Sequence, residues 1–174
     1  MELTRRPFAV LTGGIAAGLI GTAAMTSLQE VMARRRRAAL ARSGAGTNGD
    51  APSDPWEKAP APAQLARRVL MGVTGRDVPP RFIPSFTNAV HWGYGTGLGA
   101  VYAVAQEARR GRPAVRGPLF GMGVWAWSYA TLVPAGFYQW PWHYRAGAIA
   151  KDVSYHLVYG SGVAAGYELA RGRG

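Results

Sequence analysis

The sequence predicts an all-α, polytopic membrane protein with four transmembrane helices arranged as two duplicated helical hairpins. Three observations support this prediction. Four long segments are nearly free of charge, as bilayer-spanning helices of about 20 apolar residues require. A polar and glycine-rich motif occurs twice at a constant offset of 65 residues. Glycine is abundant, with 24 residues, and many of the small residues recur four positions apart, which permits close helix packing in lipid.

The four expected helices are nearly uncharged along their length. The first holds no charge between Arg6 and Glu30, the second is uncharged until its last turn, and the third is uncharged throughout. The fourth is the weakest candidate, because Lys151, Asp152 and Glu168 lie near its ends. Soluble helices alternate polar and apolar faces, which disfavours the alternative of a soluble bundle. The expected helices cover about 8–30, 86–108, 117–136 and 148–170.

The connection between the first two helices divides into two parts. Residues 43–62 are rich in Gly, Pro, Ser and Asp, a composition that predicts a flexible loop. Residues 63–71 place Leu65, Val69 and Leu70 near one face of a short helix, with Gly72 as its stop signal. This helix is either an interfacial helix lying on the membrane surface or an ordinary amphipathic loop helix. We expect residues 1–174 to form a single membrane domain.

Charge and composition limit the classes of partner and chemistry. The chain has 20 Lys and Arg against 9 Asp and Glu, a net charge of +11. These charges fall between and at the ends of apolar segments, as in membrane proteins, so we expect the lipid bilayer as a partner and no nucleic acid. The absence of cysteine excludes disulfides and thiolate sites. No enzyme signature is present, so we expect a non-enzymatic protein without a cofactor. The charges of the connections leave membrane orientation open.

The repeated motif reads HWGYGTGLGAVY at 91–102 and HLVYGSGVAAGY at 156–167. The duplication predicts that both hairpins enter the membrane from the same side, with both termini on one side. On a helix, the shared polar residues and glycines lie on one face, which would bring His91 and His156 to equal depth. Asp152 precedes His156 by four residues, so a carboxylate–imidazole pair can form. The candidate polar intramembrane face comprises His91, Tyr94, Asp152, His156 and Tyr159.

Three interpretations of this face remain open. The His and Tyr side chains can hydrogen-bond between helices as packing groups. They can form a proton or ion pathway, since histidine titrates near neutral pH. Two histidines can also hold a metal or haem, although a zinc site would want more ligands. Ionisable groups inside a span are candidates for function because their burial is costly.

The glycines predict where helices approach closely, within one chain or in a homo-oligomer. Gly14 and Gly18 resemble Gly117 and Gly121 in spacing, and the backbones of the second and fourth helices are expected to cross at Gly95 and Gly160. The segment 137–145 is rich in aromatics, which favours an aromatic belt at the headgroup level over a ligand cage. The glycines expected at helix contacts are Gly14, Gly18, Gly95, Gly99, Gly117, Gly121, Gly160, Gly162 and Gly166.

Three features together resemble the YagU-like family of small bacterial inner-membrane proteins of unknown function. They are GLIGTAAM at 18–25, the first copy of the repeated motif, and the run from GPLFGMGVWAWSYATLVPAGFY at 117–138 through the second copy. The resemblance implies a multi-pass protein of the bacterial cytoplasmic (inner) membrane and carries over no catalytic residues. We expect a role in envelope stress or in small-solute or ion passage. The alternative is a His-ligated haem or metal redox membrane protein.

Overall fold

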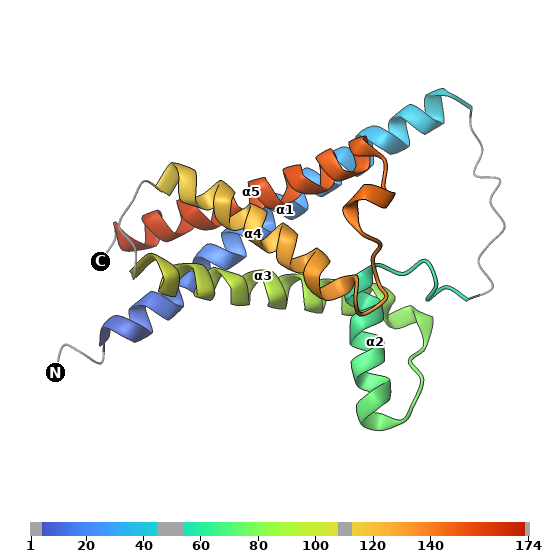
Figure 1. Ribbon diagram of the computed structural model, residues 1–174, viewed down its shortest axis with the longest axis horizontal. Coiled ribbons are helices and arrows are strands. Elements are labelled where there is room, and N and C mark those ends of the chain that lie inside the picture. Colours follow the sequence, from blue (N-terminus) through green and yellow to red (C-terminus); the bar gives the residue numbers. More distant parts are fainter. Residues whose placement is uncertain (1–4, 45–53, 108–112, 173–174) are drawn as a thin grey trace. The chain divides into compact units, whose positions relative to one another are not determined.

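The computed structural model describes residues 5–44, 54–107 and 113–172. Within these ranges the chain forms α-helices and short 3-10 helices and contains no strand, so the all-α prediction is confirmed (Figure 1). The chain divides into two compact units. We call Met1–Ser27 with Trp92–Gly174 the bundle unit, and Leu28–His91 the linker unit. Helices α1 (Arg5–Arg42) and α3 (Ile83–Glu107) contribute residues to both units.

Helix α1 is longer than expected, with 38 residues, or about 57 Å at about 1.5 Å per residue. The predicted end near residue 30 is wrong, since the helix continues to Arg42. Alanine, leucine and arginine are good helix formers, and Arg34 pairs with Glu30 one turn earlier, at 3.1 Å. Among the described helices, α1 alone is long and apolar enough by composition to cross a membrane, over Pro7–Arg42. On its own this helix favours a membrane location without fixing the number of spans.

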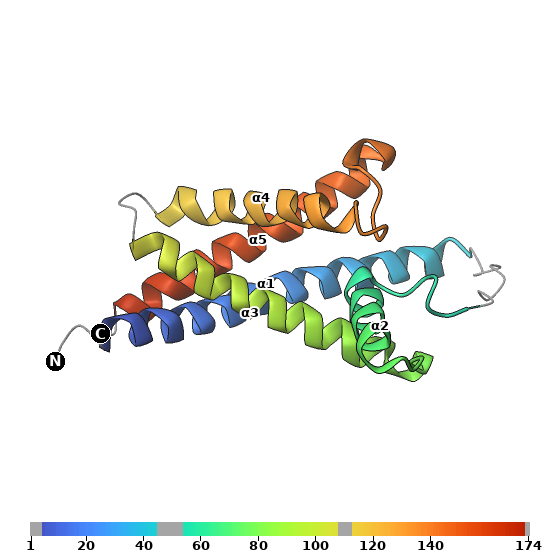
Figure 2. The same ribbon diagram turned by 60° about the horizontal axis from the view of Figure 1, so that its bottom comes forward.

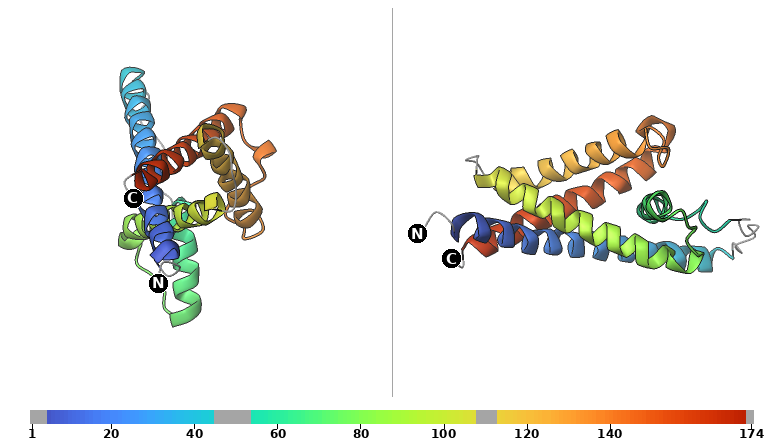
Figure 3. Two further views of the ribbon diagram at one scale, coloured as in Figure 1. Left: turned by 90° about the vertical axis from the view of Figure 1, so that its left-hand side faces the viewer. Right: turned by 90° about the horizontal axis from the view of Figure 1, so that it is seen from below.

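The bundle unit contains four helices that run alternately up and down. The start of α1 lies against the end of α5 (Ala146–Arg171). A Cβ added to Gly13 would lie 3.6 Å from the Cβ of Ala170. At the same end, Tyr167 of α5 donates a hydrogen bond of 2.8 Å to Glu107 at the end of α3. The views in Figures 2 and 3 show this alternation.

Helix α4 (Pro113–Leu132) and α5 lie side by side and form the second hairpin. The expected range of 117–136 is displaced by one turn. The helix starts earlier because Pro113 suits a first turn, which leaves Pro118 inside it. It ends earlier because Pro134 cannot continue a helix and disfavours helical geometry in the residue before it. The connection to α5 holds the 3-10 helix η2 (Pro141–His143).

Close backbone contacts occur within each hairpin at equivalent places. A Cβ added to Gly18 of α1 would lie 2.8 Å from the carbonyl oxygen of Gly95, and one added to Gly117 of α4 would lie 2.8 Å from that of Gly160. Gly95 and Gly160 are related by the motif offset of 65. Gly18 is therefore the equivalent of Gly117, and the expected equivalence of Gly14 with Gly117 and of Gly18 with Gly121 is displaced by one helical turn.

The expected crossing of α3 and α5 at Gly95 and Gly160 is also wrong. A Cβ on Gly95 would clash with Thr22 of α1, and one on Gly160 would lie 2.6 Å from the backbone nitrogen of Gly121 of α4. Each glycine therefore packs against the other helix of its own hairpin. An added Cβ would approach another helix at 3.0 Å or less at each of the glycines expected at helix contacts, which are Gly14, Gly18, Gly95, Gly99, Gly117, Gly121, Gly160, Gly162 and Gly166.

Small residues and tyrosines fill the centre of the bundle unit. Tyr102 and Tyr167, which occupy the last position of each motif copy, pack edge to face with ring centroids 6.0 Å apart and an interplanar angle of 87°. Both rings are buried. The remaining buried members of this cluster are Ala17, Ala103, Val124, Tyr159, Val163 and Ala164.

The linker unit has its own small core around Trp56. Residues 45–53 of the expected loop 43–62 lie outside the described residues. Residues 54–60 are irregular, as expected of a loop, but they pack into a core that the composition did not predict. Trp56 is buried at 3% exposure, and α2 (Ala61–Thr74) begins inside the expected loop. The helix passes Gly72, the expected stop, and ends at Gly75, whose φ of 65° forms a left-handed cap.

Candidate functional site

Asp152 of α5 lies at the centre of a polar cluster in the bundle unit. Its Oδ2 atom accepts a hydrogen bond of 3.0 Å from Nε1 of Trp125 and one of 3.1 Å from the hydroxyl of Tyr129, both on α4. Its Oδ1 atom lies 3.7 Å from Nδ1 of His156. The carboxylate–imidazole pair predicted from the four-residue spacing is therefore present. Neither Trp125 nor Tyr129 was a candidate, because nothing in the sequence indicates which residues of α4 face Asp152.

The backbone fixes the tautomer of His156 when the ring is neutral. Nδ1 of the ring lies 2.9 Å from the backbone carbonyl oxygen of Asp152. A carbonyl oxygen only accepts, so Nδ1 carries the proton and Nε2 of the neutral ring is an acceptor. The imidazole is 13% exposed and the Asp152 side chain 33% exposed. Water can therefore reach the carboxylate more readily than the imidazole.

Further aromatic rings surround this cluster. The Tyr129 ring lies 5.1 Å from that of Trp125, 5.5 Å from that of Tyr138 and 6.4 Å from that of Tyr144, centroid to centroid. Burial raises the pKa of Tyr138, and the negative charge of Asp152 raises it further. The aromatic residues of segment 137–145 therefore form two groups. Tyr138 and Tyr144 pack beside Tyr129. Trp140 and Trp142 stack on each other, with an interplanar angle of 6°.

The other candidate residues do not join this site. Tyr159 donates a hydrogen bond of 2.6 Å to the carbonyl oxygen of Gly95, which joins α5 to α3. Its motif partner Tyr94, on α3, is 44% exposed. His91 belongs to the linker unit, so its predicted meeting with His156 stays a prediction. Of the predicted polar face, the structure brings together Asp152 and His156.

A second polar cluster was missed by the sequence reasoning. Glu107 at the end of α3 accepts a hydrogen bond from Tyr167 and lies 3.8 Å from Arg171, whose guanidinium sits over the Tyr167 ring. The cluster fastens the end of α3 to the end of α5. A charged residue at the end of each helix was visible in the sequence, but spacing alone does not pair residues that lie 64 positions apart.

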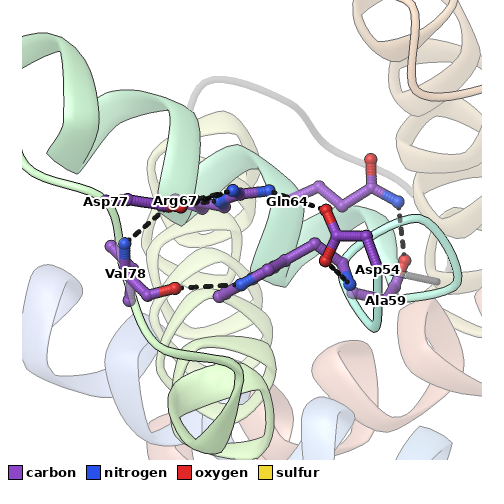
Figure 4. A network of polar contacts seen from close by, with 7 residues as sticks. Asp54, Ala59, Gln64, Arg67, Asp77 and Val78 are labelled. Atoms are coloured by element: carbon purple, nitrogen blue, oxygen red, sulfur yellow. Dashed lines mark hydrogen bonds and ion pairs between the residues drawn. The ribbon is translucent and has the colours of Figure 1, made fainter.

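The linker unit contains a third cluster, shown in Figure 4. The Trp56 indole donates a hydrogen bond of 2.9 Å to the carbonyl oxygen of Val78. The Arg67 guanidinium lies 4.9 Å from the centre of a Trp56 ring and pairs with Asp77 at 2.9 Å. The hydrogen bond from the backbone of Val78, followed by that from Arg67, lowers the pKa of Asp77. These contacts hold the irregular segments of the unit in place.

Across the residues that the structure describes, no three His, Cys, Asp or Glu side chains gather as a metal site would require. Comparisons with protein-family models, with curated proteins and with solved structures find no match. The cluster around Asp152 is therefore the candidate site, on its chemistry and geometry alone.

Proposed function

We propose that the chain is a non-enzymatic, multi-pass protein of the bacterial cytoplasmic membrane that binds or passes a small cation or solute. In this proposal α1, α3, α4 and α5 cross the bilayer. The observation that carries it is an inverted distribution of side chains in the bundle unit. Phe8, Leu119 and Trp127 are 72%, 64% and 59% exposed, whereas glycines, a threonine and tyrosines fill helix contacts. Water-soluble proteins bury large apolar side chains, while helices in lipid meet through small and polar residues.

Helix lengths and composition support the same location. Helices α3, α4 and α5 have 25, 20 and 26 residues, or about 30 to 39 Å at about 1.5 Å per residue. The hydrocarbon core of a bilayer is about 30 Å thick. Unlike α1, these three helices contain, within the described residues, no stretch that is apolar enough by composition alone to qualify as a span. Glycines and tyrosines lower the hydropathy of these helices, and most of these residues lie at helix contacts. The resemblance to YagU-like inner-membrane proteins agrees with this proposal.

The proposed activity rests on the position and chemistry of Asp152. It is the seventh residue of α5, about 9 Å from the first residue at about 1.5 Å per residue, so it would lie near one face of the bilayer. Ionisable groups inside spans are costly and mark ion or substrate sites by default. A partly exposed carboxylate beside an imidazole can hold a proton or another cation that arrives from water.

A flux assay tests the proposed activity. Proteoliposomes loaded with a pH-sensitive dye should dissipate an imposed gradient of methylammonium or potassium faster than empty liposomes between pH 5 and 8. Asp152→Asn should reduce this rate to the empty-liposome level, and Trp142→Leu, which changes the exposed stacked pair, should not. Parent protein indistinguishable from empty liposomes under all these conditions would contradict passage.

The haem or metal alternative has its own measurement. We expect purified protein to be colourless. A Soret band that disappears in His91→Ala or His156→Ala would replace the proposed activity with redox chemistry. Because Nδ1 of His156 faces a backbone carbonyl, Nε2 would be the ligand atom in that case.

A further inference from the structure

The cluster around Asp152 combines one carboxylate with non-parallel aromatic rings. The planes of Tyr138 and Tyr144 are inclined to that of Tyr129 by 50° and 79°, and the plane of Trp125 by 52°. The three rings pack against Tyr129 at centroid distances of 5.1 to 6.4 Å, and each is tilted against it instead of lying in a flat stack. The exposed pair Trp140 and Trp142, inclined by 6°, shows the contrasting arrangement within the same connection.

We propose that Asp152, Trp125, Tyr129, Tyr138 and Tyr144 form a binding site for an alkylammonium cation. The ring faces carry negative potential that attracts cations, and aromatic cages with this property bind substituted ammonium groups. The Oδ1 atom of Asp152 supplies the opposite charge, and the 33% exposure of that side chain gives access from water. This inference rests on the cation-binding part of the proposed function and names the class of ligand.

The donor set disfavours a hard metal ion at the same place. Calcium takes six to eight oxygen ligands and magnesium a full octahedron. Here Oδ2 of the one carboxylate already accepts hydrogen bonds from Trp125 and Tyr129. The tyrosine hydroxyl that donates to Oδ2 is a poor ligand for such ions, and the backbone carbonyl oxygen of Asp152 already faces Nδ1 of His156. An alkylammonium needs one negative charge and apolar or aromatic surface, which this cluster supplies.

The contacts of the Asp152 side chain fix its conformation before a cation binds. Two fixed donors on α4 hold Oδ2 on one side, and His156 borders Oδ1 at 3.7 Å. The carboxylate therefore does not need to reorganise when a cation binds, which reduces the entropy lost on binding.

Binding is tested with full-length protein purified in detergent and tetramethylammonium chloride as the probe. Sodium chloride at equal ionic strength is the reference. The parent should bind tetramethylammonium in isothermal titration calorimetry, and Asp152→Asn should bind about tenfold more weakly or not at all. Asparagine keeps the shape and the oxygen that Trp125 and Tyr129 use, so the change removes mainly the charge.

Three further variants separate the contribution of the Tyr138 ring from folding defects. Tyr138→Phe keeps the ring and should bind like the parent, whereas Tyr138→Leu should bind several-fold more weakly. Trp142→Leu removes an exposed ring of the same connection and should bind like the parent. Circular dichroism checks that each variant melts as the parent does.

Two outcomes would overturn the site. One is a parent that shows no binding beyond the sodium chloride reference, and the other is a Trp142→Leu loss equal to that of Tyr138→Leu. Binding without flux in proteoliposomes would keep the site and reject passage. Flux that Asp152→Asn abolishes, without tetramethylammonium binding, would keep passage and reject this ligand class.

Discussion

Replacing Gly117 with alanine tests the contact between α4 and α5 most simply. The new Cβ would lie 2.8 Å from the carbonyl oxygen of Gly160 and 2.8 Å from the Cβ of Ala164. Ordinary van der Waals contact begins near 3.4 Å, so the helices must separate locally by about 0.6 Å. A gap of about 0.5–1 Å between packed atoms removes a quarter to a half of the van der Waals attraction of each affected atom pair. Overpacking of this kind destabilises by about 1–3 kcal/mol.

Gly123→Ala is the matched control, six residues along the same helix. A Cβ there would meet nothing within 4 Å, so the change should leave the stability unaltered or raise it by up to about 1 kcal/mol through helix propensity. Thermal or denaturant unfolding in detergent, followed by circular dichroism, measures both variants. A Gly117→Ala protein that unfolds with the same free energy as Gly123→Ala would refute the contact.

Two further predictions concern other hydrogen bonds and the effect of pH. Tyr159→Phe removes the hydroxyl that donates to the Gly95 carbonyl and should lower the free energy of unfolding by about 1 kcal/mol; an unchanged melt would contradict that role. The pKa of Asp77 is lowered from 3.8 by Val78 and Arg67, so its stabilising contribution is present above about pH 4 and is lost as pH falls through the folded-state pKa. Tryptophan fluorescence of the linker unit between pH 2 and 6 should show this loss, and Asp77→Asn should remove that part of the pH dependence.

The sequence predicts the helices because their uncharged, glycine-rich segments are long and continuous. It also predicts that the motif glycines pack, since a residue without a side chain has few other uses inside an apolar helix. It does not reveal which helix each glycine meets. The atoms nearest to a Cβ added at Gly160 belong to α4, and this depends on tertiary geometry that helical periodicity cannot encode.

The sequence predicts the part of the candidate site that lies on α5 but not the part that lies on α4. Asp152 and His156 share a helix, so their four-residue spacing predicts their contact from helical geometry alone. Trp125 and Tyr129 come from another helix, and finding them required the register of α4 against α5. The Trp56 cluster was also not predicted, because a Gly- and Pro-rich composition on average disfavours a core. Here a single tryptophan forms one, since a hydrogen-bond acceptor and apolar neighbours lie close to its side chain.

The accessibility of chain positions in sealed membranes tests the four-span account most directly. The chain has no cysteine, so single cysteines report position without background. A membrane-impermeant maleimide should reach Gln139→Cys, in the connection between α4 and α5, from the side opposite to Gly172→Cys. Tags at Met1 and Gly174 should lie together on the side of Gly172. Tags on opposite sides, or equal labelling of both cysteines in sealed vesicles, would contradict the two-hairpin membrane fold.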